Sequence, residues 1–208
     1  MMNRYFICFL LFIMAANNCA AQDAVRKVTK NYFRSDPFTG EFSAFLKHII
    51  NDPSIKGKEL FQRSDTGLFY LHGFYSTHNP FFFKPKKIEV VLAEVEINYS
   101  DSAAFTDTIL LYQLVAYADS LNEVKKEFEK IHRQIKGGFS KTNYQEQNSK
   151  PVATAGWHNY FLSTYALAPV TIMWGKSKET GEAVLNITVR LKANYNRASL
   201  PAPLLPGL

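Results

Sequence analysis

Cysteine is scarce in this sequence, since the 208 residues include only two, Cys8 and Cys19. Both lie in residues 1–21, where one charged residue, Arg4, is followed by an unbroken apolar run. That run is too short to span a bilayer comfortably, and its form is typical of a secretory signal peptide. We therefore expect residues 1–21 to be a signal peptide and the mature chain to begin at Gln22.

The expected mature chain has no cysteine. This excludes disulfides, cysteine nucleophiles and cysteine-ligated zinc or iron–sulfur sites, so the fold must depend on its hydrophobic core. A rival interpretation makes Cys19 the lipid-bearing first residue of a bacterial lipoprotein, but that modification usually follows a small residue and here follows Asn18. Export as a periplasmic or secreted protein, from a bacterial source, is the favoured expectation.

The sequence also lacks the short motifs of the common enzyme classes. It has no G-x-S-x-G nucleophile elbow, no complete S-x-x-K set, no Walker motif and no dinucleotide-binding glycine pattern. None of its histidines has a metal-ligand spacing such as H-x-x-x-H, so we expect neither a metal site nor a cofactor. The five histidines are His48, His72, His78, His132 and His158.

Two of these histidines, His48 and His132, are expected to be surface or rim residues rather than ligands. Two others lie in predicted strands, where they could meet in space, and two glutamates share one face of another predicted strand. An enzyme acting on envelope glycan or peptide would draw its acid–base groups from these four residues, which are His72, His158, Glu94 and Glu96. A hydrolase or transferase is therefore the alternative function, and a purely structural subunit is the second alternative.

Two segments carry apolar residues at helical spacing. The first spans residues 37–51, between two Asp-Pro pairs that favour a helix start and a helix stop. The second spans residues 121–137, where Ser120 and Glu123 have capping-box spacing and a glycine ends the pattern. Charged residues occupy its opposite face, and its apolar stripe consists of Leu121, Val124, Phe128, Ile131 and Ile135.

Most remaining segments alternate as strands do. Residues 59–75 predict a hairpin with its turn at 64–67, and two long strands follow at 87–99 and 106–118. The second long strand is apolar on both faces, which predicts a central place in the sheet. A turn over residues 178–181 joins the last two of three later strands, at 156–166, 169–177 and 183–193.

The predicted order is helix, four strands, helix, three strands. Short connections require antiparallel neighbours, and one apolar stripe per helix requires packing on one sheet face, so the fold class is α+β with an antiparallel sheet of about six to seven strands. We expect a single domain at residues 37–195, a lead segment at 22–36 and a disordered tail at 196–208. Two helix-plus-strand halves, 37–118 and 119–193, can also be drawn, although no shared residue pattern links them.

The stretch HNPFFFKPKK, residues 78–87, is the most unusual in the chain. It has three interpretations: a short edge strand bracketed by Pro80 and Pro85 with lysines guarding the edge, an exposed aromatic anchor for a ligand, or an aromatic and basic contact with an anionic membrane. The candidate binding residues are Phe81, Phe82, Phe83, Lys84, Lys86 and Lys87, with Trp157 and Trp174 as neighbours.

Formal charge favours anionic partners. The chain has a net charge of +6 at pH 7, and removal of residues 1–21, which contain Arg4 and no acidic residue, leaves +5. Such a balance favours encounter with anionic lipid or polyanionic glycan, whereas nucleic acid is not expected for an exported protein. The sequence thus predicts a small exported protein with a non-catalytic binding or envelope-associated role, whose partner is an envelope protein, a glycan or an anionic membrane surface.

Overall fold

The computed structural model describes residues 30–34, 42–62, 69–98, 106–137, 144–148, 154–162 and 170–192. The predicted signal peptide, the start of the mature chain and the predicted tail therefore lie outside the described residues. Within them, the chain forms a helical turn at residues 30–33 and the helices α2 (Phe42–Asn51) and α3 (Leu121–Gly137).

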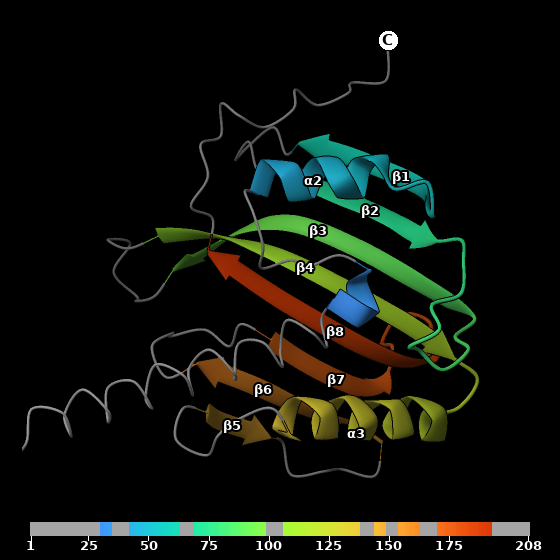
Figure 1. The fold of residues 1–208 in the computed structure, drawn as a ribbon. Coiled ribbons are helices and arrows are strands. Elements are labelled where there is room, and N and C mark those ends of the chain that lie inside the picture. The colour runs from blue at the N-terminus through green and yellow to red at the C-terminus, as the bar shows by residue number, and fades with distance from the viewer. Residues whose placement is uncertain are drawn as a thin grey trace, which may run out of the picture.

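Eight strands form one antiparallel sheet in the order β1-β2-β3-β4-β8-β7-β6-β5 (Figure 1). This confirms the predicted α+β class. The strand β5 was missed because its sequence, YQEQN, is short and polar and gives no alternating apolar signal. The strands are β1 (Ile55–Gln62), β2 (Phe69–Tyr75), β3 (Lys87–Asn98), β4 (Thr106–Ala118), β5 (Tyr144–Asn148), β6 (Gly156–Leu162), β7 (Val170–Lys176) and β8 (Ala183–Lys192).

The sheet consists of two halves with the same order of elements. One half is α2 followed by β1, β2, β3 and β4, and the other is α3 followed by β5, β6, β7 and β8. Antiparallel pairing of β4 with β8 joins the halves at the centre of the sheet, where β4 was expected from its apolar sequence. Figure 1 shows both helices and the turn at residues 30–33 on the same side of the sheet.

The hydrophobic core lies between this side of the sheet and the helices. At its centre, Leu92 on β3, Tyr112 on β4 and Val189 on β8 are paired neighbours, and all three are buried. Helix α3 packs on β7, β8 and β4. It does so through the predicted stripe, of which Val124, Phe128, Ile131 and Ile135 are buried.

Local residue patterns set the ends of several elements. The capping box of α3 forms as predicted, because the Glu123 carboxylate accepts the Ser120 N–H and the Ser120 hydroxyl accepts the Glu123 N–H, each at 3.3 Å. The turn between β7 and β8 also forms, with Gly181 at a φ of 72° and its N–H donating to the Ser177 carbonyl at 3.0 Å.

Candidate functional site

The HNPFFFKPKK stretch is a loop rather than the edge strand that was one interpretation of it. Residues 76–86 connect β2 to β3 without strand structure. The chain turns there because Asn79 accepts two backbone N–H groups: its carbonyl accepts from Phe82 at 3.1 Å and its side-chain oxygen from Phe81 at 2.9 Å. A polar turn residue before a proline therefore overrides the extended form that the aromatic run favours.

The three phenylalanines have three different environments. Phe82 is buried, with 5% of its surface exposed, and its ring meets Tyr32 edge to face at a centroid distance of 4.6 Å. Phe83 is half-buried against the core. Phe81 is 49% exposed. Phe82 thus belongs to the core, as the edge-strand interpretation required. Phe81 is presented to solvent, as the two binding interpretations required.

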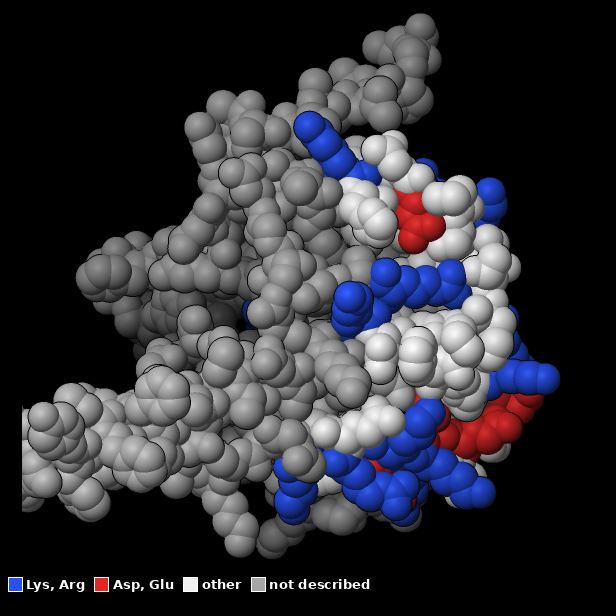
Figure 2. Space-filling view, in the orientation of Figure 1, with Lys and Arg blue, Asp and Glu red and all other residues white. Residues whose placement is uncertain are grey.

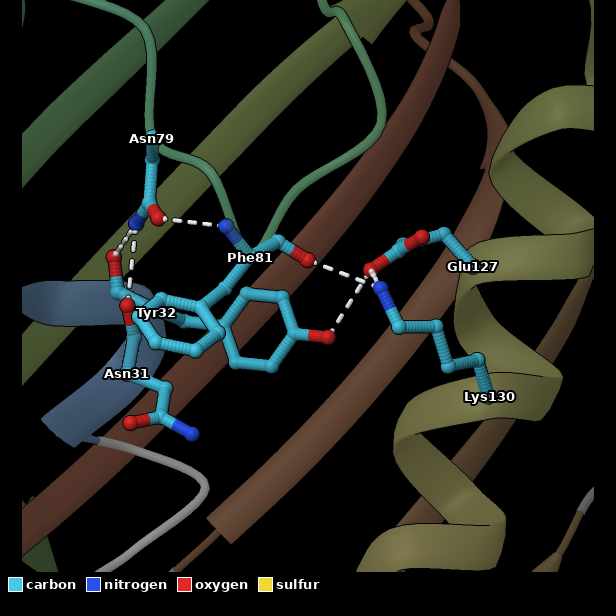
Figure 3. Close-up of polar contacts among 6 residues, drawn as sticks. All are labelled: Asn31, Tyr32, Asn79, Phe81, Glu127 and Lys130. Atoms are coloured by element: carbon cyan, nitrogen blue, oxygen red, sulfur yellow. Dashed lines mark hydrogen bonds and ion pairs between the residues drawn. The ribbon is translucent and has the colours of Figure 1, made fainter.

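Asn79 joins this loop to the turn at residues 30–33. Its side-chain amide donates to the carbonyls of Asn31 and Tyr32, each at 3.0 Å, while its oxygen accepts the Phe81 N–H (Figure 3). The asparagine itself is 1% exposed. Because every donor and the acceptor of this buried amide are used, Asn79 holds the loop in one conformation.

Helix α3 holds the same loop from the other side. The buried Glu127 carboxylate accepts hydrogen bonds from the Tyr32 hydroxyl at 2.8 Å and from the Lys130 ammonium at 2.9 Å. Lys130 also donates to the Phe81 carbonyl at 2.8 Å (Figure 3). Burial, followed by the charge and hydrogen bond of Glu127, raises the pKa of Tyr32 far above its ordinary value, so this hydroxyl remains a donor. Phe81 is therefore an exposed ring on a fixed backbone.

Basic residues lie in the same loop as Phe81 and on the helix that contacts it. Lys84 follows Phe81 in the loop and is exposed, and three basic residues lie on α3 at positions i, i+4 and i+7, which places them on one side of the helix. Figure 2 shows that lysine and arginine side chains gather over α3 on this face of the molecule. We call this the Phe81 surface and define it as Phe81, Phe83, Lys84, Lys126, Lys130 and Arg133.

The other two lysines of the predicted set lie elsewhere. Lys86 pairs with Asp119 at 2.6 Å, and the hydrogen bond and charge of Asp119 raise its pKa. Lys87 is on β3 and points to the sheet face opposite the helices, where its ammonium lies 2.7 Å from Glu89 and 4.4 Å from the centroid of the Tyr117 ring. Neither is part of the Phe81 surface.

The two tryptophans do not neighbour the loop either. Trp174 is 3% exposed and packs in the core, 6.4 Å from the ring of Phe128 on α3. Trp157 lies on β6 with its side chain on the opposite face of the sheet, since the adjacent His158 faces α3. Of the eight predicted residues, the structure thus brings together Phe81, Phe83 and Lys84, buries Phe82 next to Phe83 and places the other four elsewhere.

The two strand histidines, for which the sequence left a meeting in space open, do not meet. His72 lies between Tyr70 and Phe74 on the face opposite the helices, whereas His158 faces the helices, so the sheet separates the two. His158 stacks instead on His132 of α3, at a centroid distance of 4.0 Å.

His132 itself is half-buried, which fits the expected surface or rim position, and its Nδ1 lies 2.9 Å from the Tyr160 hydroxyl. It lies four residues after Phe128, on the edge of the apolar stripe, which accounts for its partial burial. His48, by contrast, is exposed as expected.

The four groups of the alternative enzyme function do not converge. Glu94 is 6% exposed and faces the helices from β3, while Glu96 is exposed. His158 is on β6, four strand spacings from β3, which corresponds to about 19 Å at 4.8 Å per spacing. His72 is on the other face. The described part of the chain contains no group of three or more His, Cys, Asp or Glu side chains placed to hold a metal ion.

No helix in the described residues is long and apolar enough to cross a membrane. Comparison with known proteins gives no relative: no protein-family model, no curated protein and no solved structure matches this chain.

Proposed function

We propose that this is an exported, non-catalytic binding protein that attaches peripherally to an anionic membrane surface of the cell envelope through the Phe81 surface. The observation that carries the proposal is the exposed Phe81 ring, whose backbone is held by Asn79 and by Lys130 from the basic side of α3.

An aromatic ring among lysines suits the boundary between headgroups and acyl chains. The ring can enter the apolar boundary, while the long lysine and arginine stems let the charges remain with anionic headgroups. Holding the ring on a fixed backbone before contact removes part of the ordering cost of binding. The charges supply attraction at a distance, and the ring adds a short-range contact.

The expected affinity is low and reversible. Each cation close to an anionic bilayer contributes about 1 kcal/mol. Lys130 shares its charge with Glu127, which leaves Lys84, Lys126 and Arg133 as the principal contributors. Phe81 is already half-buried, so its insertion adds about 1 kcal/mol. The total, about 4 kcal/mol, corresponds to a dissociation constant of about 1 mM in accessible lipid.

Co-sedimentation with vesicles tests this proposal. The protein, in the processed form that mass spectrometry identifies after export, is mixed with vesicles of phosphatidylcholine alone or of phosphatidylcholine with phosphatidylglycerol. We expect binding to the anionic vesicles that falls as salt rises, because salt screens exposed charges.

A pair of double variants tests whether the Phe81 surface, rather than the net charge of the protein, drives vesicle binding. Lys126→Gln with Arg133→Gln removes two cations of the Phe81 surface, whereas Lys176→Gln with Lys178→Gln removes two exposed cations at the turn between β7 and β8. The first should weaken binding to anionic vesicles about tenfold or more, and the second much less. Equal losses would mean that net charge alone drives binding, and the proposal would be wrong.

A further inference from the structure

The sheet face opposite the helices carries residues that the proposed function does not use. On β8, Leu185, Ile187 and Val189 are buried beneath the helices, so the alternate residues face the other way. Among the described residues, no helix lies on that second face (Figure 1). We call it the open face.

One row of side chains crosses the open face. Strand pairing aligns Asn159 on β6, Thr171 on β7, Thr188 on β8 and Gln113 on β4, and the row continues through Val91 on β3 to the second half of the sheet. Four neighbouring strands therefore carry a continuous series of amide and hydroxyl groups, of which Asn159, Thr171 and Gln113 are partly exposed and Thr188 is buried, with 7% of its surface exposed.

Hydrogen bonds fix the orientation of this polar row. Thr171 donates to the Asn159 side-chain oxygen at 2.7 Å, and Arg190 donates to the Thr171 hydroxyl at 2.7 Å. Thr188 donates to the side-chain oxygen of Asn186 at 3.0 Å. Each of these groups retains further donor or acceptor capacity, because a hydroxyl or an amide can make more than one hydrogen bond.

Beyond Val91 the same row reaches an aromatic ladder. On β2, His72 pairs with Val91 and lies edge to face with Phe74 at a centroid distance of 4.7 Å. Tyr70 is next along the strand, and Phe61 on β1 lies 4.8 Å from it and is 49% exposed. None of these rings belongs to the described hydrophobic core, because they stand on the face away from the helices.

A second apolar contact bounds the other end of the row. Trp157 on β6 pairs with Met173 on β7, and Met173 is 43% exposed. From β6 to β1 the sheet spans six strand spacings, or about 29 Å. The open face therefore has a hydrogen-bonding centre between two apolar ends.

The described charges of the open face nearly cancel, in contrast with the Phe81 surface. Lys87 is held against Glu89, which also accepts a hydrogen bond from the Tyr117 hydroxyl at 2.9 Å. Lys56 and Glu59 add one charge of each sign on β1, and Arg190 on β8, which donates to Thr171, adds one positive charge. A nearly neutral surface does not favour anionic lipid or nucleic acid, both of which are bound through an excess of cations.

The composition of the row also decides between a glycan and a second copy of this chain. Face-to-face packing of two sheets buries interdigitating apolar side chains. Here it would bury the partly exposed amides of Asn159 and Gln113 and the hydroxyl of Thr171, which is costly unless each meets a partner. A sugar ring instead offers an apolar C–H face that packs on aromatic rings and a rim of hydroxyls that pair with amide and guanidinium groups.

We propose that the open face binds a neutral oligosaccharide chain, with its sugar rings on the ladder of Phe61 and Tyr70 and on Trp157, and its hydroxyls on the polar row. This goes beyond membrane attachment and does not depend on it. If both hold, the protein has its lipid contact on one face of the sheet and its glycan contact on the other.

Titration calorimetry with neutral hexasaccharides tests the proposal. The probes are cellohexaose, chitohexaose and mannohexaose, and trigalacturonate serves as an acidic comparison. We expect at least one neutral probe to bind with a dissociation constant that changes little with salt, since no net charge is neutralised. If none of the three neutral probes binds at millimolar concentration, or if the acidic probe binds best, the proposal is wrong.

Matched variants locate the binding site. Phe61→Ala and Trp157→Ala should each weaken binding of the active probe about threefold to tenfold, whereas Phe81→Ala, which changes a ring on the helix side, should leave it unchanged. Gln113→Ala tests the contribution of the polar row, because it removes one amide of the row and little packing. Sedimentation velocity adds a check: a dimer that Trp157→Ala dissociates would show that the open face is a self-interface and would overturn the proposal.

Discussion

Asn79 is the residue on which the conformation of the Phe81 loop depends most. Replacing it by alanine leaves two carbonyls, of Asn31 and Tyr32, and the Phe81 N–H without their hydrogen-bond partner. Unsatisfied buried groups cost about 1 to 3 kcal/mol each, so we expect Asn79→Ala to lower the free energy of unfolding by about 3 kcal/mol. Urea unfolding measures this, with the exposed Asn122→Ala as control. A loss below about 0.5 kcal/mol would show that the amide does not hold the loop.

Sequence reasoning at this scale indicated that the three phenylalanines differ in environment but not which of them is buried. In an extended chain Phe81 and Phe83 point one way and Phe82 the other, so at least one of the three leaves the core unless both faces are covered. Phe82 is the buried one because its ring meets Tyr32, a residue 50 positions earlier, and Tyr32 in turn bonds to Glu127, 95 positions later. Contacts over such separations leave no local pattern. The sequence therefore could not show that Tyr32 is the partner or that Phe82 is the phenylalanine it contacts.

At the scale of single elements, local chemistry was a reliable guide. The apolar stripe of α3, its capping box and the turn before β8 all formed where residue spacing placed them, because each depends on neighbours within four residues. Strand β5 was missed since nothing in its polar sequence distinguishes a short edge strand from a loop.

Gly156 tests how closely β6 and β7 are packed. A methyl group at this position would lie 2.6 Å from the Trp174 indole nitrogen, so Gly156→Ala must displace a buried ring. We expect a loss of about 1 to 3 kcal/mol in the free energy of unfolding. The chain has two tryptophans, so a Trp157→Phe background isolates Trp174, whose emission should shift to longer wavelength. An unchanged spectrum, equal to that of the exposed Thr154→Ala, would contradict this packing.

For the whole molecule, buried tyrosines predict instability at high pH. Tyr75 donates to the Phe33 carbonyl at 2.9 Å, and its burial is the main cause that raises its pKa to about 12. Above pH 10 the unfolded chain loses this proton while the folded chain retains it, so stability falls as pH rises. Between pH 10 and about 12 the loss from Tyr75 is on the order of 2 to 3 kcal/mol.

Urea unfolding at pH 8, 10 and 11 measures this slope. Tyr75→Phe should be less stable than the parent by about 1 kcal/mol at pH 8, because it lacks the hydrogen bond, yet lose less stability above pH 10. Parallel stability curves for the two proteins would contradict the assignment. The stability of Tyr75→Phe should still fall with pH to some extent. Tyr32, whose pKa is also raised by burial, accounts for part of that remaining dependence.

The arrangement of the whole sheet shows where sequence reasoning stopped. Antiparallel neighbours and the α+β class followed from short connections and one-sided helices. The pairing of β4 with β8 joins strands far apart in the chain, and it sets which face and which neighbours each histidine has. His72 and His158 were therefore placed in the right elements, but their relation across the sheet depended on a strand order that only the structure supplies.

The most direct test of the central claim compares two phenylalanines on opposite faces of the sheet. Phe81 and Phe61 are both 49% exposed, so alanine removes a similar exposed ring from each. On phosphatidylglycerol vesicles, we predict that Phe81→Ala weakens binding about threefold to tenfold and that Phe61→Ala has no effect. Equal effects of the two substitutions, or binding of the parent protein to neutral vesicles as strong as to anionic ones, would contradict membrane attachment through the Phe81 surface.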